Sequence, residues 1–122
     1  MSFLSHLEAV VSQVDGALAC SVMGFDGIAI ETHTLEGHDD LELSNTWVEF
    51  ANVLTQVKSA AELLKTGAVS ELSINSEKVI TLMRMVTSEY FLVLALKPEG
   101  NYGKGRYVLR LAAPKVKAEL QA

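Results

Sequence analysis

The hydrophobic pattern is least interrupted at Tyr90–Leu96, where apolar residues follow one another without alternation. A strand of this kind is buried on both faces, so we expect it in the middle of a sheet with layers above and below it. Ala17–Met23 is apolar at almost every position and predicts a second central strand. Ile28–Thr34 is more polar, which places this strand near a sheet edge.

Two shorter segments complete the expected set of strands. Val69–Asn75 alternates, with Leu72 and Ile74 predicted to face inward, which is typical of a strand with one solvated face. Val79–Val86 follows after a short turn and is also predicted to be a strand. Because tight turns join these strands, we expect antiparallel hairpins and not a parallel sheet.

Apolar residues recur at three- and four-residue spacing in residues 3–14, 43–65 and 102–121, which predicts three amphipathic helices. Ser2 is in position to cap the first helix, and His6 is expected on its surface.

The last of these helices contains a proline, Pro114, which removes one helical amide and predicts a bend or an end of the helix there. We interpret its core-facing stripe as Tyr107, Leu111 and Val116, with Val108, Ala112 and Ala118.

The long helix over 43–65 has an unusually wide apolar face. At 100° per residue its apolar side chains cover about half of the circumference, whereas covering one face of a sheet needs a stripe of only ~100°. The surplus favours packing against a second copy of the chain. The alternative is that Trp47 and Phe50 wrap the edges of the same sheet. The predicted dimer interface comprises Trp47, Val48, Phe50, Val53, Val57, Ala60 and Leu64.

The element order is helix, two strands, long helix, three strands, helix. It predicts a single α+β domain over residues 1–122, folded as a three-layer α-β-α sandwich. We expect a five-stranded antiparallel sheet, with the long helix on one face and the N- and C-terminal helices on the other.

Composition narrows the possible functions. The chain has 122 residues, of which 49% are hydrophobic, and a net charge of −5. Acidic proteins are not expected to bind nucleic acid or anionic membranes in general. No basic and apolar leader precedes Ser2, and no apolar run approaches the ~20 residues of a membrane span, so a cytoplasmic protein without membrane insertion is expected.

Candidate catalytic, metal-binding and cofactor-binding patterns are weak. The glycine cluster Gly100–Gly105 lacks the spacing of a Walker loop and the third glycine of a dinucleotide-binding loop, so no cofactor is expected. The set His33, His38, Asp39 and Asp40 is too closely spaced for a zinc site, so no metal is expected. The single cysteine, Cys20, lies within an apolar strand, and no histidine pairs with a nucleophile, so the chain is not expected to be an enzyme.

The arginines offer no obvious catalytic finger for a GTPase. Arg84 lies on a predicted strand, and Arg106 and Arg110 lie on a helix that packs on the sheet. An arginine supplied in trans should extend from a mobile loop.

The most distinctive predicted surface feature is the hairpin turn Gly24–Ile28. Phe25 stands between two glycines with little sheet to pack on, Ile28 opens the next strand, and Asp26 adds a hydrogen-bond acceptor. Interface centres combine aromatic and aliphatic anchors in this way. We therefore predict that Phe25, Asp26 and Ile28 bind a partner protein; the alternative is that Phe25 folds back onto a neighbouring helix.

Short motifs add a family resemblance over nearly the whole chain. They are Val14–Ala17 before the first strand, Asp26–Ile28 at the hairpin, and Gly103–Arg106 with Leu109 and Leu111 in the last helix. Together with the element order they resemble the Roadblock (dynein light-chain) family, and within it the small bacterial members of the MglB and MglC type, more the latter.

The resemblance implies a homodimer in which the long helices pair and the sheets join. It also implies a role in a bacterial cell-polarity and gliding-motility pathway that contains a Ras-like GTPase. The expected partner is an MglB-like Roadblock protein or a response-regulator-type polarity protein. Direct activation or exchange stimulation of a Ras-like GTPase is the alternative. MglB-type members carry an additional C-terminal tail, whereas this sequence stops at Ala122, which favours the adaptor function.

Overall fold

The computed structural model describes residues 2–35 and 43–122. His38, Asp39 and Asp40 of the candidate metal set lie outside the described residues. The helices are α1 (Phe3–Gln13), α2 (Leu43–Leu64) and α3 (Tyr102–Leu120). The strands are β1 (Ala17–Gly24), β2 (Ala29–Thr34), β3 (Glu71–Asn75), β4 (Ile80–Met85) and β5 (Tyr90–Leu96). Each lies within two residues of a segment that the hydrophobic pattern predicts.

The described strands form one antiparallel sheet in the order β2-β1-β5-β4-β3. The predicted central position of β5 is confirmed, because it lies between β1 and β4 and is buried from Phe91 to Leu96. The edge position of β2 is confirmed as well, and β3 forms the opposite edge.

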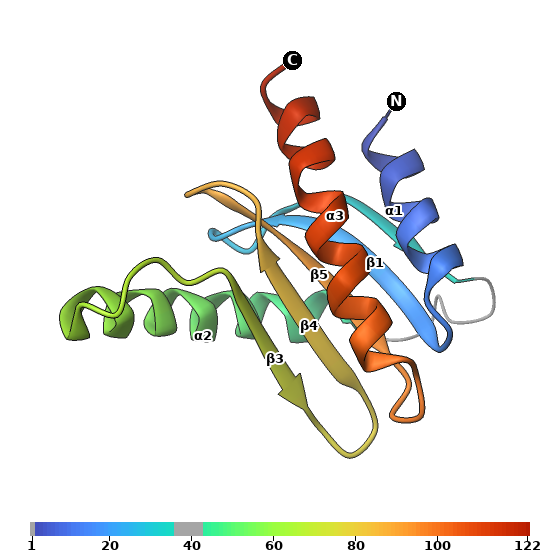
Figure 1. Ribbon diagram of the computed structural model, residues 1–122, viewed down its shortest axis with the longest axis horizontal. Helices are drawn as coiled ribbons and strands as arrows, with labels where there is room; N and C mark the ends of the chain where they lie inside the picture. The colour runs from blue at the N-terminus through green and yellow to red at the C-terminus, as the bar shows by residue number, and fades with distance from the viewer. Residues whose placement is uncertain (1, 36–42) are drawn as a thin grey trace.

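The predicted layers are confirmed: α1 and α3 cover one face of the sheet, and α2 crosses the other (Figure 1). Leu92 and Leu94 of β5 pack in the α1/α3 core, whereas Phe91 and Val93 pack in the α2 core. Successive residues of β5 therefore enter two different cores, which explains why its sequence does not alternate.

The beginnings of α1 and α3 are determined locally. Ser2 caps α1, as predicted, through a reciprocal pair of hydrogen bonds with Ser5. Asn101 caps α3, because its side-chain oxygen accepts a hydrogen bond from the Lys104 backbone amide at 3.1 Å. Each cap satisfies a backbone donor that has no partner within the helix.

The face of α3 that packs on the sheet differs from the prediction. The buried residues are Gly105, Val108, Leu109, Ala112, Ala113 and Val116, whereas Tyr107 and Leu111 are each 48% exposed. At 100° per residue, positions 107 and 111 lie almost opposite position 116. The prediction failed because α3 has apolar residues on two opposite faces, and the sequence pattern does not show which of the two packs on the sheet.

The burial of His6 and the position of Pro114 within α3 also differ from or complete the predictions. His6, expected on the surface, is buried, and its Nε2 lies 3.3 Å from Oε1 of Glu119. Its side chain is covered because α3 packs beside α1 on the same face of the sheet. Pro114 does not end α3, which continues to Leu120.

Candidate protein-interaction site

The hairpin turn between β1 and β2 is held by its own hydrogen bonds. The carboxylate of Asp26 accepts a hydrogen bond from the backbone amide of Ile28 at 3.0 Å. The amide of Gly24 donates to the carbonyl of Ile28 at 2.9 Å. Gly27 has φ +86°, a conformation that residues with a side chain rarely adopt. Asp26 thus stabilises the turn, besides presenting a charge to solvent.

Phe25 is anchored by three separate parts of the chain. Its ring centroid lies 5.1 Å from that of Phe91 in β5, and Nζ of Lys58 in α2 lies 3.8 Å from the ring centroid. Its backbone amide donates to the carbonyl of Glu89 at 3.1 Å. The expectation that Phe25 has little sheet to pack on is therefore wrong, and the ring is half-buried. The turn is rigid as a result.

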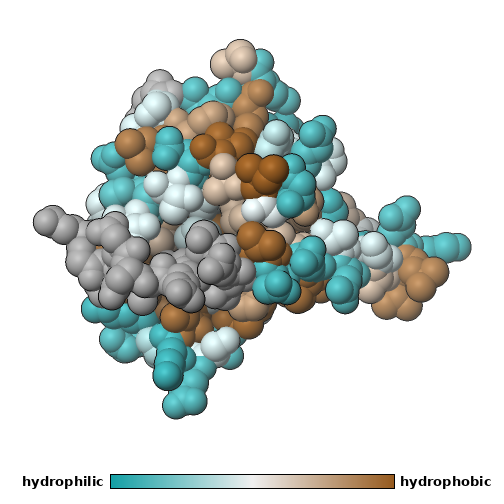
Figure 2. Space-filling view, turned by 180° about the vertical axis from the view of Figure 1, so that it is seen from behind, coloured by the Kyte–Doolittle hydropathy of each residue, from teal (hydrophilic) through white to brown (hydrophobic). Residues whose placement is uncertain are grey.

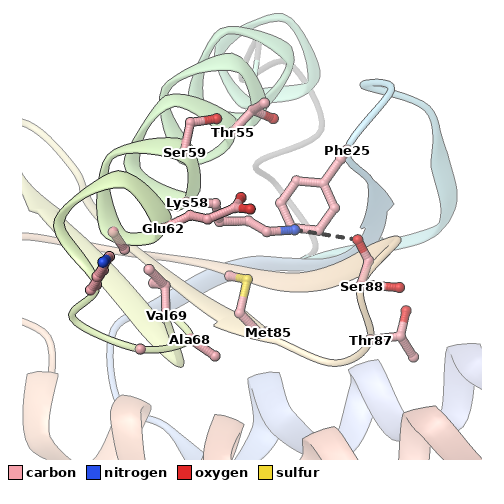
Figure 3. A pocket seen from close by; sticks show the side chains of 13 residues that line it. Phe25, Thr55, Lys58, Ser59, Glu62, Ala68, Val69, Met85, Thr87 and Ser88 are labelled. Carbon is pink, nitrogen blue, oxygen red and sulfur yellow. Dashed lines mark hydrogen bonds between the residues drawn. The ribbon is translucent and has the colours of Figure 1, made fainter.

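A hollow of about 930 Å³ opens beside Phe25, and we call it the α2 hollow. Residues from α2, the segment before β3 and the β4–β5 turn line it, among them Lys58, Glu62, Val69, Met85 and Ser88. Figure 3 shows Lys58 reaching from α2 past the Phe25 ring, where it donates a hydrogen bond to the Ser88 carbonyl at 3.3 Å. Phe25 also lines this hollow and is half-buried, so part of its side chain can be reached from the hollow.

Ile28 is the exposed anchor of the turn. Its side chain is 67% exposed, although an isoleucine in an isolated domain is normally buried. Val48 of α2 lies beside the turn and is 39% exposed; a Cβ added at Gly27 would lie 3.4 Å from its Cγ1. The predicted residues are thus brought together, with Phe25 packed on β5 and α2, Asp26 stabilising the turn and Ile28 exposed to solvent.

The residues predicted to form a dimer interface occupy two environments. Trp47 is only 1% exposed and packs in the protomer's own core, and Phe50 packs partly against that core. Exposure increases toward the end of α2, where Leu64 is 70% exposed and Leu63, which the predicted interface did not include, is 81% exposed. Figure 2 shows apolar residues on the part of α2 that projects beyond the sheet.

The remaining residues of the predicted interface are half-buried or exposed. Val57 is half-buried, and Val53 and Ala60 are exposed. Trp47 can therefore support an interface from below, whereas the outer residues would form its contact surface.

Gly105 and Cys20, two other candidate residues from the sequence, contribute to packing. A Cβ added at Gly105 would lie 2.9 Å from Cδ1 of Leu82, so this glycine lets α3 approach the sheet closely. Burial raises the pKa of the Cys20 thiol to about 12, which leaves it protonated and unreactive. Among the described residues, no group of three histidine, cysteine or acidic side chains is placed to bind a metal ion.

Two of the three arginines are held by one acidic residue. Glu71 accepts hydrogen bonds from Arg106 and, at 3.5 Å, from Arg84. The hydrogen bond from Arg106, more than the charges of the two guanidinium groups, lowers the pKa of the Glu71 carboxyl. Arg84 lies on β4 and Arg106 on α3, whereas an arginine supplied in trans should extend from a mobile loop.

Sequence reasoning missed Lys58, Met85 and Ser88 as neighbours of Phe25. Lys58 is separated from Phe25 by more than thirty positions, and the other two lie further away in the sequence. No local pattern joins these segments, so only the packing of α2 across the sheet identifies the hollow. The wide apolar face of α2 was the one available signal that its flank is not fully used in the protomer.

Comparison with solved structures places this arrangement in a known class. The chain superposes with a TM-score of 0.86 on a Roadblock/LC7 domain from Streptomyces avermitilis, with 13% identity and full coverage of both chains. The gliding protein MglB of Thermus thermophilus gives the same TM-score at 15% identity, covering 97% of this chain and 87% of that one. At such low identity these similarities establish the fold, which is that of a Roadblock/LC7 domain.

A third solved structure establishes the relationship. MglC from Myxococcus xanthus is 65% identical, over 98% of this chain and 99% of that chain, with a TM-score of 0.71. The chain therefore belongs to the Roadblock/LC7 family as an MglC-like member. No model of a known protein family matches the chain, and no curated protein sequence matches it. In the part of the chain that is described, no helix has the length and hydrophobicity needed to cross a membrane.

Proposed function

We propose that this chain is a non-catalytic, homodimeric adaptor in a bacterial cell-polarity and gliding-motility pathway that contains a Ras-like GTPase. Its partner is an MglB-like Roadblock protein or a response-regulator-type polarity protein. The observation that carries this proposal is the hairpin turn, where Ile28 protrudes from a turn that Phe25 anchors rigidly. A rigid, exposed aliphatic anchor binds with little loss of conformational entropy.

Two features of the protomer support homodimer formation. The projecting end of α2 exposes Leu63 and Leu64, which are costly to leave in water. β3 is an edge strand with unpaired backbone groups on its outer side among the described strands. Pairing α2 with α2 and β3 with β3 would cover both. Leu64→Glu should then shift the protein toward the mass of a single chain in light scattering, whereas Glu77→Ala, on the β3–β4 turn, should not.

Direct regulation of a Ras-like GTPase is the second candidate function. It is supported by the same family membership, because the pathway that we propose contains such a GTPase. Arg84 and Arg106 are held by Glu71, so a regulator of this kind would act by positioning the GTPase's own catalytic residues.

The adaptor function is tested by titrating an MglB-like Roadblock protein with this chain in a calorimeter. Ile28→Ala should weaken binding by about tenfold or more, which is typical of an interface anchor. Leu4→Ala is the matched control, because Leu4 is also an exposed aliphatic residue but lies on α1, away from the turn. Equal affinities for the two variants would contradict the proposed role of the turn.

A further inference from the structure

The outward face of α3 has an apolar ridge that no described part of the protomer covers. The ridge consists of Tyr107, Leu111, Pro114 and Ala118, which are exposed. Their spacing of four, three and four residues is that of the contact seam between two packed helices. At 100° per residue the four positions fall within a narrow outward stripe, opposite the face that packs on the sheet.

The ridge is flanked by positive charge in an otherwise acidic protein. Five of the ten basic residues and one of the fifteen acidic residues lie in α3, so this helix carries +4 and the remaining chain carries −9. Arg110 and Lys117 lie on one side of the ridge, and Lys104 and Lys115 lie on the other.

These four cations are available to a partner. None of them is in an ion pair with an acidic residue of the described chain, whereas Arg106 is bound to Glu71. The guanidinium carbon of Arg110 lies 5.4 Å from the ring centroid of Tyr107, which holds the cation beside the ridge. The four cations are thus free to pair with carboxylates that approach from outside.

A groove runs along one side of the ridge, between α3 and α1. It has a volume of about 390 Å³, and the residues that line it include Ala9 and Gln13 of α1 and Leu111, Lys115 and Ala118 of α3. The lining is mostly apolar, and its charged members are Lys115 and Glu119, of which Glu119 lies 3.3 Å from Nε2 of His6. An aliphatic side chain can therefore enter the groove while a neighbouring carboxylate meets Lys115.

We propose that the outer face of α3 is a docking surface for an acidic amphipathic helix of a partner protein. Apolar side chains of that helix would pack on the ridge and in the groove, and its carboxylates would pair with the four cations on both sides. Such helix-in-groove recognition uses apolar anchors at three- and four-residue spacing.

The structure favours this occupant over others. A lipid bilayer of anionic headgroups or a nucleic acid would be repelled by the −9 charge of the remaining chain. Among its described helices a second copy of the chain offers no matching element: α1 has only Glu8 as an acidic residue, and the described side chains of α2 include Lys58 beside Glu49 and Glu62.

This surface lies on the face of the sheet opposite α2 (Figure 1). It does not depend on the proposed function of the hairpin turn, and both surfaces can be occupied at once. An adaptor with two such faces can hold two different partners together.

The test uses a designed, labelled helical peptide of about three heptads, with leucines at the seam positions and glutamates on both flanks. A companion peptide has lysines in place of the glutamates. Binding is followed by fluorescence anisotropy at low salt, roughly 50 mM, where charge pairing is weakly screened. The intact protein should bind the acidic peptide, lose affinity as salt increases, and not bind the lysine peptide.

Variants assign the binding to this face. Arg110→Glu with Lys115→Glu should weaken binding of the acidic peptide by about tenfold or more and should permit binding of the lysine peptide. The control, Lys78→Glu with Lys97→Glu, changes the net charge equally at exposed positions elsewhere and should leave the affinity unchanged. Tyr107→Ser with Leu111→Ser should weaken binding of the acidic peptide in the parent background and of the lysine peptide in the Arg110→Glu, Lys115→Glu background. Thermal melts followed by circular dichroism verify that each variant is folded.

The proposal is overturned if the acidic peptide does not approach saturation by about 1 mM, or if the control double variant loses as much affinity as the α3 variant. It is also overturned if Tyr107 and Leu111 are dispensable for peptide binding. Sedimentation with phosphatidylglycerol vesicles in place of peptide binding would identify a membrane surface, and self-association that these variants abolish would identify a second copy. Either result would contradict a partner helix.

Discussion

Truncating Phe25 should separate the two proposed roles of the hairpin turn, which are stabilising the fold through Phe25 and binding a partner through Ile28. Phe25 packs on Phe91 and lies under Lys58, whereas Ile28 is mostly exposed. Full truncation of a buried phenylalanine to alanine costs about 3–5 kcal/mol, and this ring is half-buried. Phe25→Ala should therefore lower the free energy of unfolding by about 2 kcal/mol. Ile28→Ala should change it by less than ~0.5 kcal/mol.

Phe25→Leu is the control for the aromatic contacts. It keeps most of the apolar volume but removes the tilted ring contact with Phe91 and the interaction with the Lys58 ammonium group, worth about 0.5–1 kcal/mol each. Its loss of stability should fall between those of Phe25→Ala and Ile28→Ala.

Urea unfolding followed by tryptophan fluorescence measures these differences, because Trp47 lies in the α2 core that Phe25 joins. An unfolding free energy of Phe25→Ala within ~0.5 kcal/mol of the parent would refute the packing described for the ring. A large effect of Ile28→Ala on stability would refute the division between support and contact.

Three further predictions concern the packing of α3, the ion pairs of Glu71 and the burial of Cys20. Gly105→Ala should destabilise the protein by about 1–2 kcal/mol, because the added Cβ would lie 2.9 Å from Cδ1 of buried Leu82. Gly103→Ala, whose added Cβ would have no atom within 4 Å, should stabilise the protein by up to ~1 kcal/mol, and thermal melts that gave the reverse order would be inconsistent with close packing of α3. The arginine partners lower the pKa of Glu71 from 4.5, so the stability that its carboxylate adds to the fold is present above pH 4.5 and is lost as the pH falls through the lowered folded pKa. Glu71→Gln should therefore be less stable than the parent at pH 7. The urea midpoints of the two proteins should approach each other in acid, and a difference that persists there would contradict this. Cys20, with a pKa of about 12, should react with a thiol reagent at pH 8 only after unfolding, and rapid reaction of the native protein would show that the strand opens.

The element order could be predicted from sequence because each strand and helix has a local signature. β5 and β1 are continuously apolar, the short turns contain Gly or Ser, and the caps at Ser2 and Asn101 are local hydrogen bonds. Such features depend on residues a few positions apart, so the periodicity of the chain is sufficient to identify them.

The failures arose where distant residues decide the outcome. α3 has apolar residues on opposite faces, and only contact with Leu82 and its neighbours shows which face is buried. Phe25 was expected to be free because Phe91 and Lys58 are remote in the sequence. His6 is covered by a helix that begins nearly a hundred residues later. Packing between remote elements cannot be deduced from a local pattern.

The adaptor function is tested most directly by measuring GTP hydrolysis by a Ras-like GTPase of the same pathway with and without an excess of this protein. An adaptor that holds partners together should leave the turnover of the isolated GTPase unchanged within about twofold. Activating proteins that supply an arginine accelerate turnover by about 10³–10⁵-fold. A rise of tenfold or more, with co-elution of the two proteins, would contradict the adaptor function and identify the chain as a direct regulator.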